Sequence, residues 1–126
     1  MKLAWLLVVN ATIVGLFGVV AVLFPGPLFD AFGGTSDVGS QFLVQLFGAA
    51  LIGEAVLRFG MRDIAPGALR KALTSAILVE YVIAFAAALM AQMSGITNTA
   101  GWVIVAFPAF FALGYGYFRF LAPNAA

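Results

Sequence analysis

Two carboxylate residues, Glu54 and Glu80, stand inside long apolar stretches of the sequence, where an ionised side chain is costly. A charge at the centre of a bilayer costs about 2.5–3.5 kcal/mol on the helix-insertion scale. Arg58 follows Glu54 by four residues, so the two side chains share one helix face and can form an ion pair. These residues are therefore the first candidates for a ligand-binding or proton-handling site.

Other polar residues are expected at a similar depth in the apolar stretches. Asn10 lies in the first stretch, and Tyr115 and Arg119 share one helix face in the last. Glu80 shares its face with three alanines, small residues that let another helix approach closely, so it should face the interior of a bundle. The sequence thus predicts a polar cluster of Asn10, Glu54, Arg58, Glu80, Tyr115 and Arg119.

Two interpretations of this cluster are compatible with the sequence. In the first, it is a structural ion-pair network that fixes the register of the helices, with one carboxyl group protonated to avoid an uncompensated charge. In the second, it is a cytoplasm-facing site for a cationic or hydrogen-bonding ligand, or it holds a proton-handling carboxyl group of a small carrier.

The composition excludes several other classes of protein. Of the 126 residues, 64% are hydrophobic and 9% are charged, values far outside the range of soluble globular proteins. The net charge of +1 and the scattered basic residues give no surface for nucleic acid. Cysteine and histidine are absent, so disulfides, thiol chemistry and the usual ligands of haem and zinc are missing. We therefore expect no metal and no cofactor.

Four apolar stretches are each long enough to cross a hydrocarbon layer of about 30 Å as a helix. The predicted spans cover approximately residues 3–23, 41–61, 73–93 and 101–121, within a single domain of residues 1–126. The Pro-Gly-Pro sequence at 25–27 favours a turn, and a short interfacial helix is expected between residues 28 and 33. Pro66 is expected at the first helical position before the third span. The first span is expected to be an uncleaved helix.

The basic residues predict the orientation of these spans. Lys and Arg occur before the first span, around the connection between the second and third spans, and at the end of the fourth. The other two connections carry only Asp30 and Asp37. Because cytoplasmic loops are enriched in Lys and Arg, both termini and the middle loop are expected in the cytoplasm. The predicted fold is an all-α integral membrane four-helix bundle of the inner membrane, with a short interfacial segment after the first helix.

Small residues recur at helical spacing in three spans. These pairs are Gly15 with Gly18, Ala49 with Gly53, and Ala112 with Gly116. Small residues of this kind let helix backbones approach closely, so we expect packing within the bundle first and contacts between copies of the chain second.

Three short motifs occur in order along the chain: Phe-Pro-Gly-Pro at 24–27, the stretch 48–53 that leads to Arg58, and Gly-Tyr-Gly-Tyr-Phe at 114–118. In these motifs the chain resembles the small bacterial four-helix membrane proteins grouped as DoxX-like or as domains of unknown function. The resemblance covers most of the chain and implies the same four-helix layout. Some relatives in that group are described as quinone-linked redox subunits, but this chain lacks the Cys and His residues that such chemistry favours. No catalytic residue is carried over.

These observations favour a non-enzymatic inner-membrane protein, either an accessory subunit or a binder of a lipophilic molecule such as a lipid, quinone or isoprenoid. The 13 phenylalanines include residues suited to line such a pocket. Membrane lipids, a larger membrane complex and further copies of the chain are the expected partners. The alternative is a small transporter or channel that uses Glu54 and Glu80. A membrane-embedded enzyme ranks third, with Tyr115 and the two glutamates as its acid–base groups.

Overall fold

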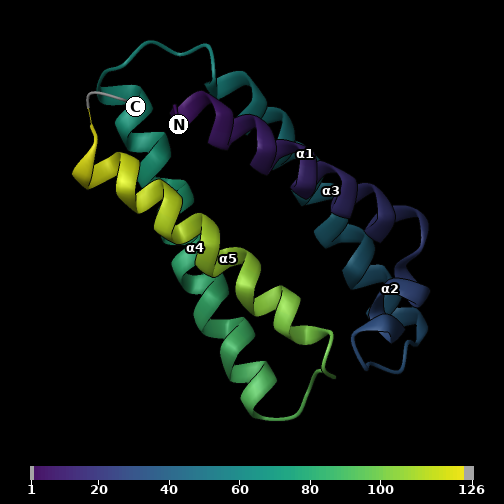
Figure 1. The fold of residues 1–126 in the computed structure, drawn as a ribbon. Coiled ribbons are helices and arrows are strands. Elements are labelled where there is room, and N and C mark those ends of the chain that lie inside the picture. The colour runs from purple at the N-terminus through teal and green to yellow at the C-terminus, as the bar shows by residue number, and fades with distance from the viewer. Residues whose placement is uncertain (1, 124–126) are drawn as a thin grey trace.

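The computed structural model describes residues 2–123 and is helical, with no strand among those residues. Its elements are α1 (Leu3–Leu23), α2 (Pro25–Ala31), α3 (Val38–Met61), α4 (Ala68–Met93), α5 (Gly101–Gly116) and the π-helical turn η1 (Tyr117–Leu121) (Figure 1). The helices α1, α3, α4 and α5 with η1 are long and apolar enough to cross a membrane. The prediction of four such helices is confirmed.

The chain leaves α1 through a second helix rather than a turn. Pro25 occupies the first turn of α2, where the missing N–H of proline costs no helical hydrogen bond. The N–H of Phe24 donates to the carbonyl of Val20 at 2.7 Å and closes α1. The short helix predicted after the first span is present, but it begins at Pro25 and not at residue 28. It is followed by Gly33, whose φ of 92° is open to glycine without strain.

The α3 helix begins earlier than predicted because Asp37 and Ser40 cap its first turn. The Ser40 N–H donates to the Asp37 carboxylate at 2.7 Å, and the Asp37 N–H donates to Ser40 Oγ at 2.8 Å. The hydrogen bonds from Ser40 lower the pKa of Asp37 below its ordinary value, so a carboxylate stays charged at the positive end of the helix dipole. The α4 helix begins at Ala68, so the prediction of Pro66 at its first position is wrong.

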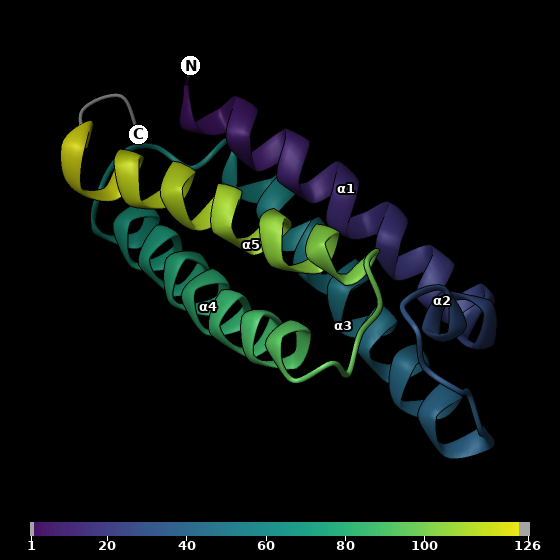
Figure 2. The same cartoon turned by 60° about the horizontal axis from the view of Figure 1, so that its bottom comes forward.

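The four long helices form two antiparallel pairs, α1 with α3 and α4 with α5 (Figure 2). Two glycines meet where α1 crosses α3: a methyl group on Gly18 would lie 2.8 Å from the Gly48 carbonyl oxygen. Gly15 also faces α3, since its methyl group would lie 3.2 Å from Ala55 Cβ. A methyl group on Gly53 would meet nothing within 4 Å, so the predicted packing of Gly53 inside the bundle is wrong.

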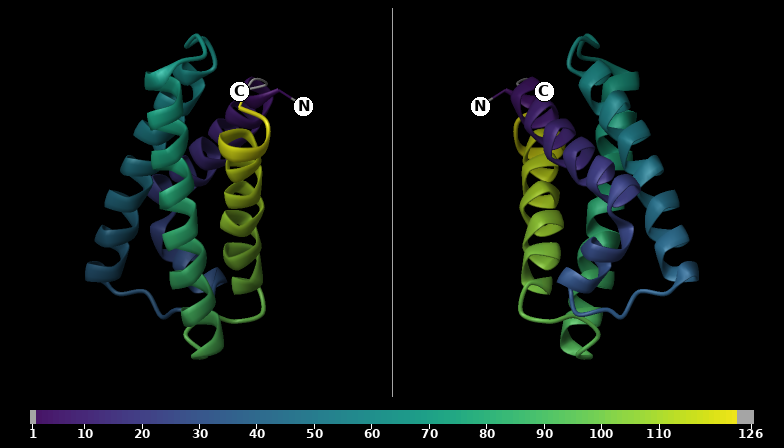
Figure 3. Two further views of the ribbon diagram at one scale, coloured as in Figure 1. Left: turned by 90° about the vertical axis from the view of Figure 1, so that its left-hand side faces the viewer. Right: turned by 90° about the vertical axis from the view of Figure 1, so that its right-hand side faces the viewer.

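Apart from Glu54, Arg58 and Glu80, the charged residues lie with the connections at the two ends of the bundle. Lys2, the α3–α4 loop and η1 lie at one end, which we call the basic end, and α2 and the α4–α5 loop lie at the opposite end (Figure 3). At the opposite end, the Asn98 N–H donates to the Phe32 carbonyl at 3.0 Å and its Nδ2 donates to the Ala31 carbonyl at 2.9 Å. The four apolar helices are compatible with a multi-pass membrane protein.

The main core lies in the half of the bundle near the basic end. It consists of Leu3, Leu6, Leu7, Met61, Ile77, Tyr81, Phe111, Tyr115 and Phe118. All four long helices contribute to this cluster, which therefore joins the two helix pairs close to the predicted polar residues.

Candidate functional site

Arg58 is the centre of the buried polar cluster. Its side chain is 1% exposed, and its Nη1 donates to Glu54 at 3.0 Å along the same helix. Its Nη2 donates to the carboxylate of Glu80 on α4. One guanidinium therefore pairs with two carboxylates and connects α3 to α4, which belong to different helix pairs.

Asn10 connects α1 to both α4 and α5. This fully buried amide donates from Nδ2 to the Tyr81 hydroxyl at 2.5 Å and accepts from the Tyr115 hydroxyl at 2.9 Å. The rings of Tyr81 and Tyr115 are stacked, with centroids 6.0 Å apart. The guanidinium carbon of Arg58 lies 5.4 Å from the Tyr81 ring centroid, within the distance of a cation–π interaction. The hydrogen-bond network of Asn10, Tyr81 and Tyr115, which we call the Asn10 network, thus adjoins the ion cluster at the Tyr81 ring. The ion cluster consists of Glu54, Arg58 and Glu80.

Tyr81 is the member of this cluster that sequence reasoning missed. It follows Glu80 directly, and neighbouring positions on a helix are separated by only about 100° around the axis, so both can face the interior of a bundle. A buried tyrosine hydroxyl requires a partner, and Asn10 supplies it. The signal that was available is the asparagine in the middle of an apolar stretch, which needs more than one partner of its own.

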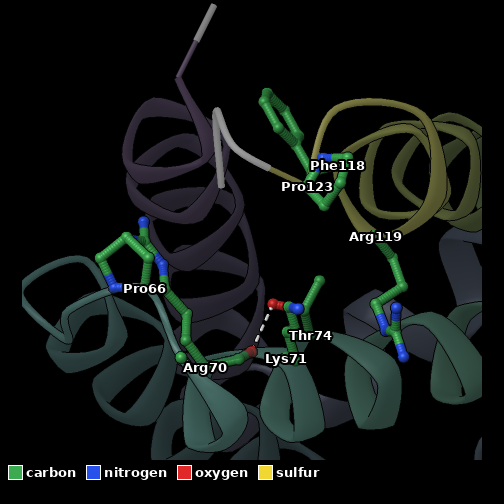
Figure 4. Close-up of a pocket in the computed structure, with 8 residues that line it drawn as sticks. Pro66, Arg70, Lys71, Thr74, Phe118, Arg119 and Pro123 are labelled. Atoms are coloured by element: carbon green, nitrogen blue, oxygen red, sulfur yellow. Dashed lines mark hydrogen bonds between the residues drawn. The ribbon is translucent and has the colours of Figure 1, made fainter.

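Arg119 lies outside the cluster, contrary to the sequence prediction. Its Nε donates to Ser75 Oγ at 2.8 Å, and Ser75 precedes Glu80 by five residues, about 7.5 Å along α4. Arg119 lines a small pocket of about 20 Å³ at the basic end, together with Arg70 and Lys71 (Figure 4). That pocket has room for about one water molecule. The physical reason for the difference is depth, because Arg119 is one helical turn closer to the end of the bundle than Tyr115.

A larger cavity of about 400 Å³ lies between the two helix pairs, on the side of the ion cluster toward α2. We call it the central cavity. Its lining residues are Ile13, Val14, Phe17, Phe32, Phe47, Leu51, Glu54, Glu80, Tyr81, Ala84, Val103, Ile104, Phe107 and Pro108. The side chains of this wall are apolar except at Glu54, Glu80 and Tyr81, which lie at the end nearest to Arg58.

The two carboxylates face both the ion cluster and the central cavity. The side chains of Glu54 and Glu80 are 38% and 39% exposed, although the Arg58 between them is almost completely buried. A carboxylate is a hydrogen-bond acceptor that favours cations and N–H or O–H donors. In residues 2–123 no group of three His, Cys, Asp or Glu side chains is placed to hold a metal ion. The two carboxylates can thus accept hydrogen bonds from a donor, or pair with a positive charge, at one end of an apolar cavity.

Comparisons with known proteins do not assign the chain to a family. No family model, no curated protein and no solved structure matches it. The resemblance to DoxX-like proteins stays a prediction, and the function is inferred from the geometry of the site.

Proposed function

We propose that the chain is a multi-pass protein of a bacterial inner membrane, with the basic end in the cytoplasm. The outward surfaces of the long helices support this proposal, because they carry exposed apolar side chains such as Leu16, Phe42, Val79 and Leu113. The basic residues outside the polar cluster lie at one end of the bundle, as the positive-inside rule requires of a cytoplasmic face.

Within that membrane the protein acts as a non-enzymatic binder of a lipophilic small molecule. The observation that carries this proposal is the central cavity, whose volume of about 400 Å³ falls within the range of roughly 300–1,000 Å³ typical of ligand sites. An apolar wall with a few polar groups at one end is the usual form of such a site. A lipid, quinone or isoprenoid has the matching form, an apolar body with one polar end.

The ligand enters the central cavity from the hydrocarbon, between α3 and α4. Both helices line the cavity, but each packs on the partner of its own pair rather than along the other. The Arg58–Glu80 ion pair joins them toward the basic end, and we place the opening for the ligand on the other side of that pair, where Leu51 and Ala84 line the cavity. A lipophilic molecule reaches such an opening without passing through water.

Native mass spectrometry of the chain purified in mild detergent tests this function. Wild-type protein should carry a bound lipophilic molecule, and Ala84→Trp should lose it because the indole fills the central cavity. Ala86→Trp is the matched control, since Ala86 is an exposed α4 residue that does not line the cavity, and it should keep the ligand. A wild-type chain free of any lipophilic molecule, or equal occupancy in both variants, would count against the proposal.

A small transporter or channel that uses Glu54 and Glu80 is the second candidate. The observation that favours it is the pair of carboxylates that share one guanidinium and face a cavity between helices. Intramembrane carboxylates of this kind are typical of ion and proton pathways. Transport into proteoliposomes that is unchanged in both Glu54→Gln and Glu80→Gln would reject this candidate.

A further inference from the structure

We infer that the ligand of the central cavity is a lipophilic cation, an apolar body with an ammonium group that lies against Glu54 and Glu80. The inference rests on the proposed binding of a lipophilic molecule and adds the charge of that molecule. The charges of the side chains at the Arg58 end of the cavity support it.

The balance of these charges is negative when both carboxyl groups are ionised. Two carboxylates face one guanidinium, so the three side chains carry a net charge of −1. Each carboxylate accepts a hydrogen bond from Arg58 through its Oε2 atom, whereas a carboxylate has about four acceptor positions. An ammonium group supplies the missing positive charge and up to three further donors. With both carboxyl groups ionised, a bound cation therefore balances the charge of the site.

The same arrangement disfavours an anionic head group. Among the described residues that line the cavity, none carries a positive charge. Arg58 is 1% exposed and is covered by its two carboxylate partners, so a phosphate or carboxylate ligand would meet negative oxygens first. Arg70 and Arg119 line the small pocket at the basic end and not the central cavity.

Two aromatic rings add to the attraction for a cation. Tyr81 and Phe107 both line the cavity, and their ring centroids are 5.9 Å apart in an edge-to-face arrangement. The Tyr81 ring already lies close to one cation, the guanidinium of Arg58. Aromatic faces stabilise alkylammonium ions when water is excluded. Both electrostatic contributions thus favour the same sign of charge.

Three ligands with one apolar cage and different head groups test the inference: 1-aminoadamantane, 1-adamantanol and 1-adamantanecarboxylate. Their binding to the full chain in an uncharged detergent at pH 7 is measured by isothermal titration calorimetry, with protein-free micelles as the blank. We expect the ammonium form to bind at least about tenfold more tightly than the alcohol, which is the size of a charge-assisted hydrogen bond, and the carboxylate to bind most weakly.

Glu54→Gln is the informative variant, because it keeps the Arg58–Glu80 pair that joins α3 to α4. It should lower the affinity for the amine about tenfold and the affinity for the alcohol by a smaller factor, because the alcohol donates a hydrogen bond but carries no charge. Asp63→Asn removes a carboxylate that is 73% exposed outside the cavity, and it should change neither affinity.

The outcomes separate this inference from the proposed function. Alcohol or carboxylate binding as tight as that of the amine overturns the inference, while binding of a lipophilic molecule still stands. Absence of binding by all three compounds overturns the inference, whereas the proposed function is overturned only if the wild-type chain also carries no lipophilic molecule in native mass spectrometry. An unchanged preference for the amine in Glu54→Gln overturns the assignment of the charge recognition to the carboxylates.

Discussion

Arg58 is more deeply buried than any other charged residue in the described part of the chain, and its partners make that burial tolerable. Removing an ion from water costs several kcal/mol, which only close opposite charges and further contacts can offset. Glu54 supplies one charge within the same helix, Glu80 supplies another from α4, and Tyr81 covers the guanidinium with its ring. The burial of Arg58 thereby depends on residues of α3 and α4, which belong to different helix pairs.

Replacing Arg58 with methionine should lower the stability of the chain. The change leaves two carboxylates without a counter-ion, and we expect a loss near the lower end of about 3–5 kcal/mol, because both carboxylates also reach the cavity. Arg62→Met is the matched control: Arg62 pairs with the exposed Asp63, and its loss should cost less than about 1 kcal/mol. Thermal unfolding followed by circular dichroism in detergent measures both.

A triple variant identifies the cause of that loss. Glu54→Gln, Arg58→Met and Glu80→Gln together leave no unpaired charge, so most of the lost stability should return. If Arg58→Met is as stable as Arg62→Met, the ion cluster does not hold the two helix pairs together.

The sequence predicts the local part of this cluster better than its long-range part. Spacing along one helix is sufficient for the Glu54–Arg58 pair. Asn10 and Tyr81 are 71 positions apart, and their contact depends on how two helix pairs are placed against each other. For Arg119 the error of the prediction is in depth. Its helix face fits the cluster, but it lies one turn closer to the basic end and donates to Ser75 instead.

At the scale of helices, apolar length predicts which segments are long helices, and local hydrogen bonds decide where they begin. The sequence predicts the first span with the same bounds that α1 has, Leu3–Leu23. The start of α3 moves to Val38 because Asp37 and Ser40 cap each other, a contact between two side chains that hydropathy does not register. Packing faces are predicted less well, because glycine spacing alone does not say whether another helix lies opposite.

Gly48 and Gly53 offer a matched pair for testing the contact between α1 and α3. A methyl group on Gly48 would lie 2.7 Å from the Gly18 carbonyl oxygen and 2.8 Å from Ala21 Cβ, so Gly48→Ala should destabilise the chain by about 1–3 kcal/mol. Gly53→Ala meets open space in the same helix and should be neutral or stabilising by up to about 1 kcal/mol. The midpoints of thermal unfolding in detergent compare the two. Equal effects of the two substitutions would contradict the close approach of α1 and α3.

At the scale of the whole molecule, the two helix pairs are joined near the basic end and separated by the central cavity toward the opposite end. The core cluster, the ion cluster and the Asn10 network all lie on the first side. Toward the second side the pairs meet where Phe107 of α5 packs against Ala11, Val14 and Ala55, and where Asn98 contacts the end of α2. This uneven distribution of contacts leaves space for a ligand, and no pattern within a single helix indicates it.

The proposed orientation in the membrane is tested with single cysteines, because the natural sequence contains none. Thr35 lies in the α2–α3 loop and Ala65 in the α3–α4 loop, at opposite ends of the bundle, and both are exposed. A maleimide that cannot cross membranes should label Thr35→Cys in intact bacterial spheroplasts and should label Ala65→Cys only after the membrane is opened. The expectation follows from the basic residues, which are retained on the cytoplasmic side during insertion, whereas the α2–α3 loop carries no positive charge.

Labelling of Ala65→Cys in intact spheroplasts would reverse the orientation and place the basic end outside. Labelling of both cysteines before the membrane is opened would instead contradict insertion in a single orientation. The result also determines which surface of the membrane is nearer to Glu54 and Glu80, because both residues lie at the end of the central cavity toward the basic end.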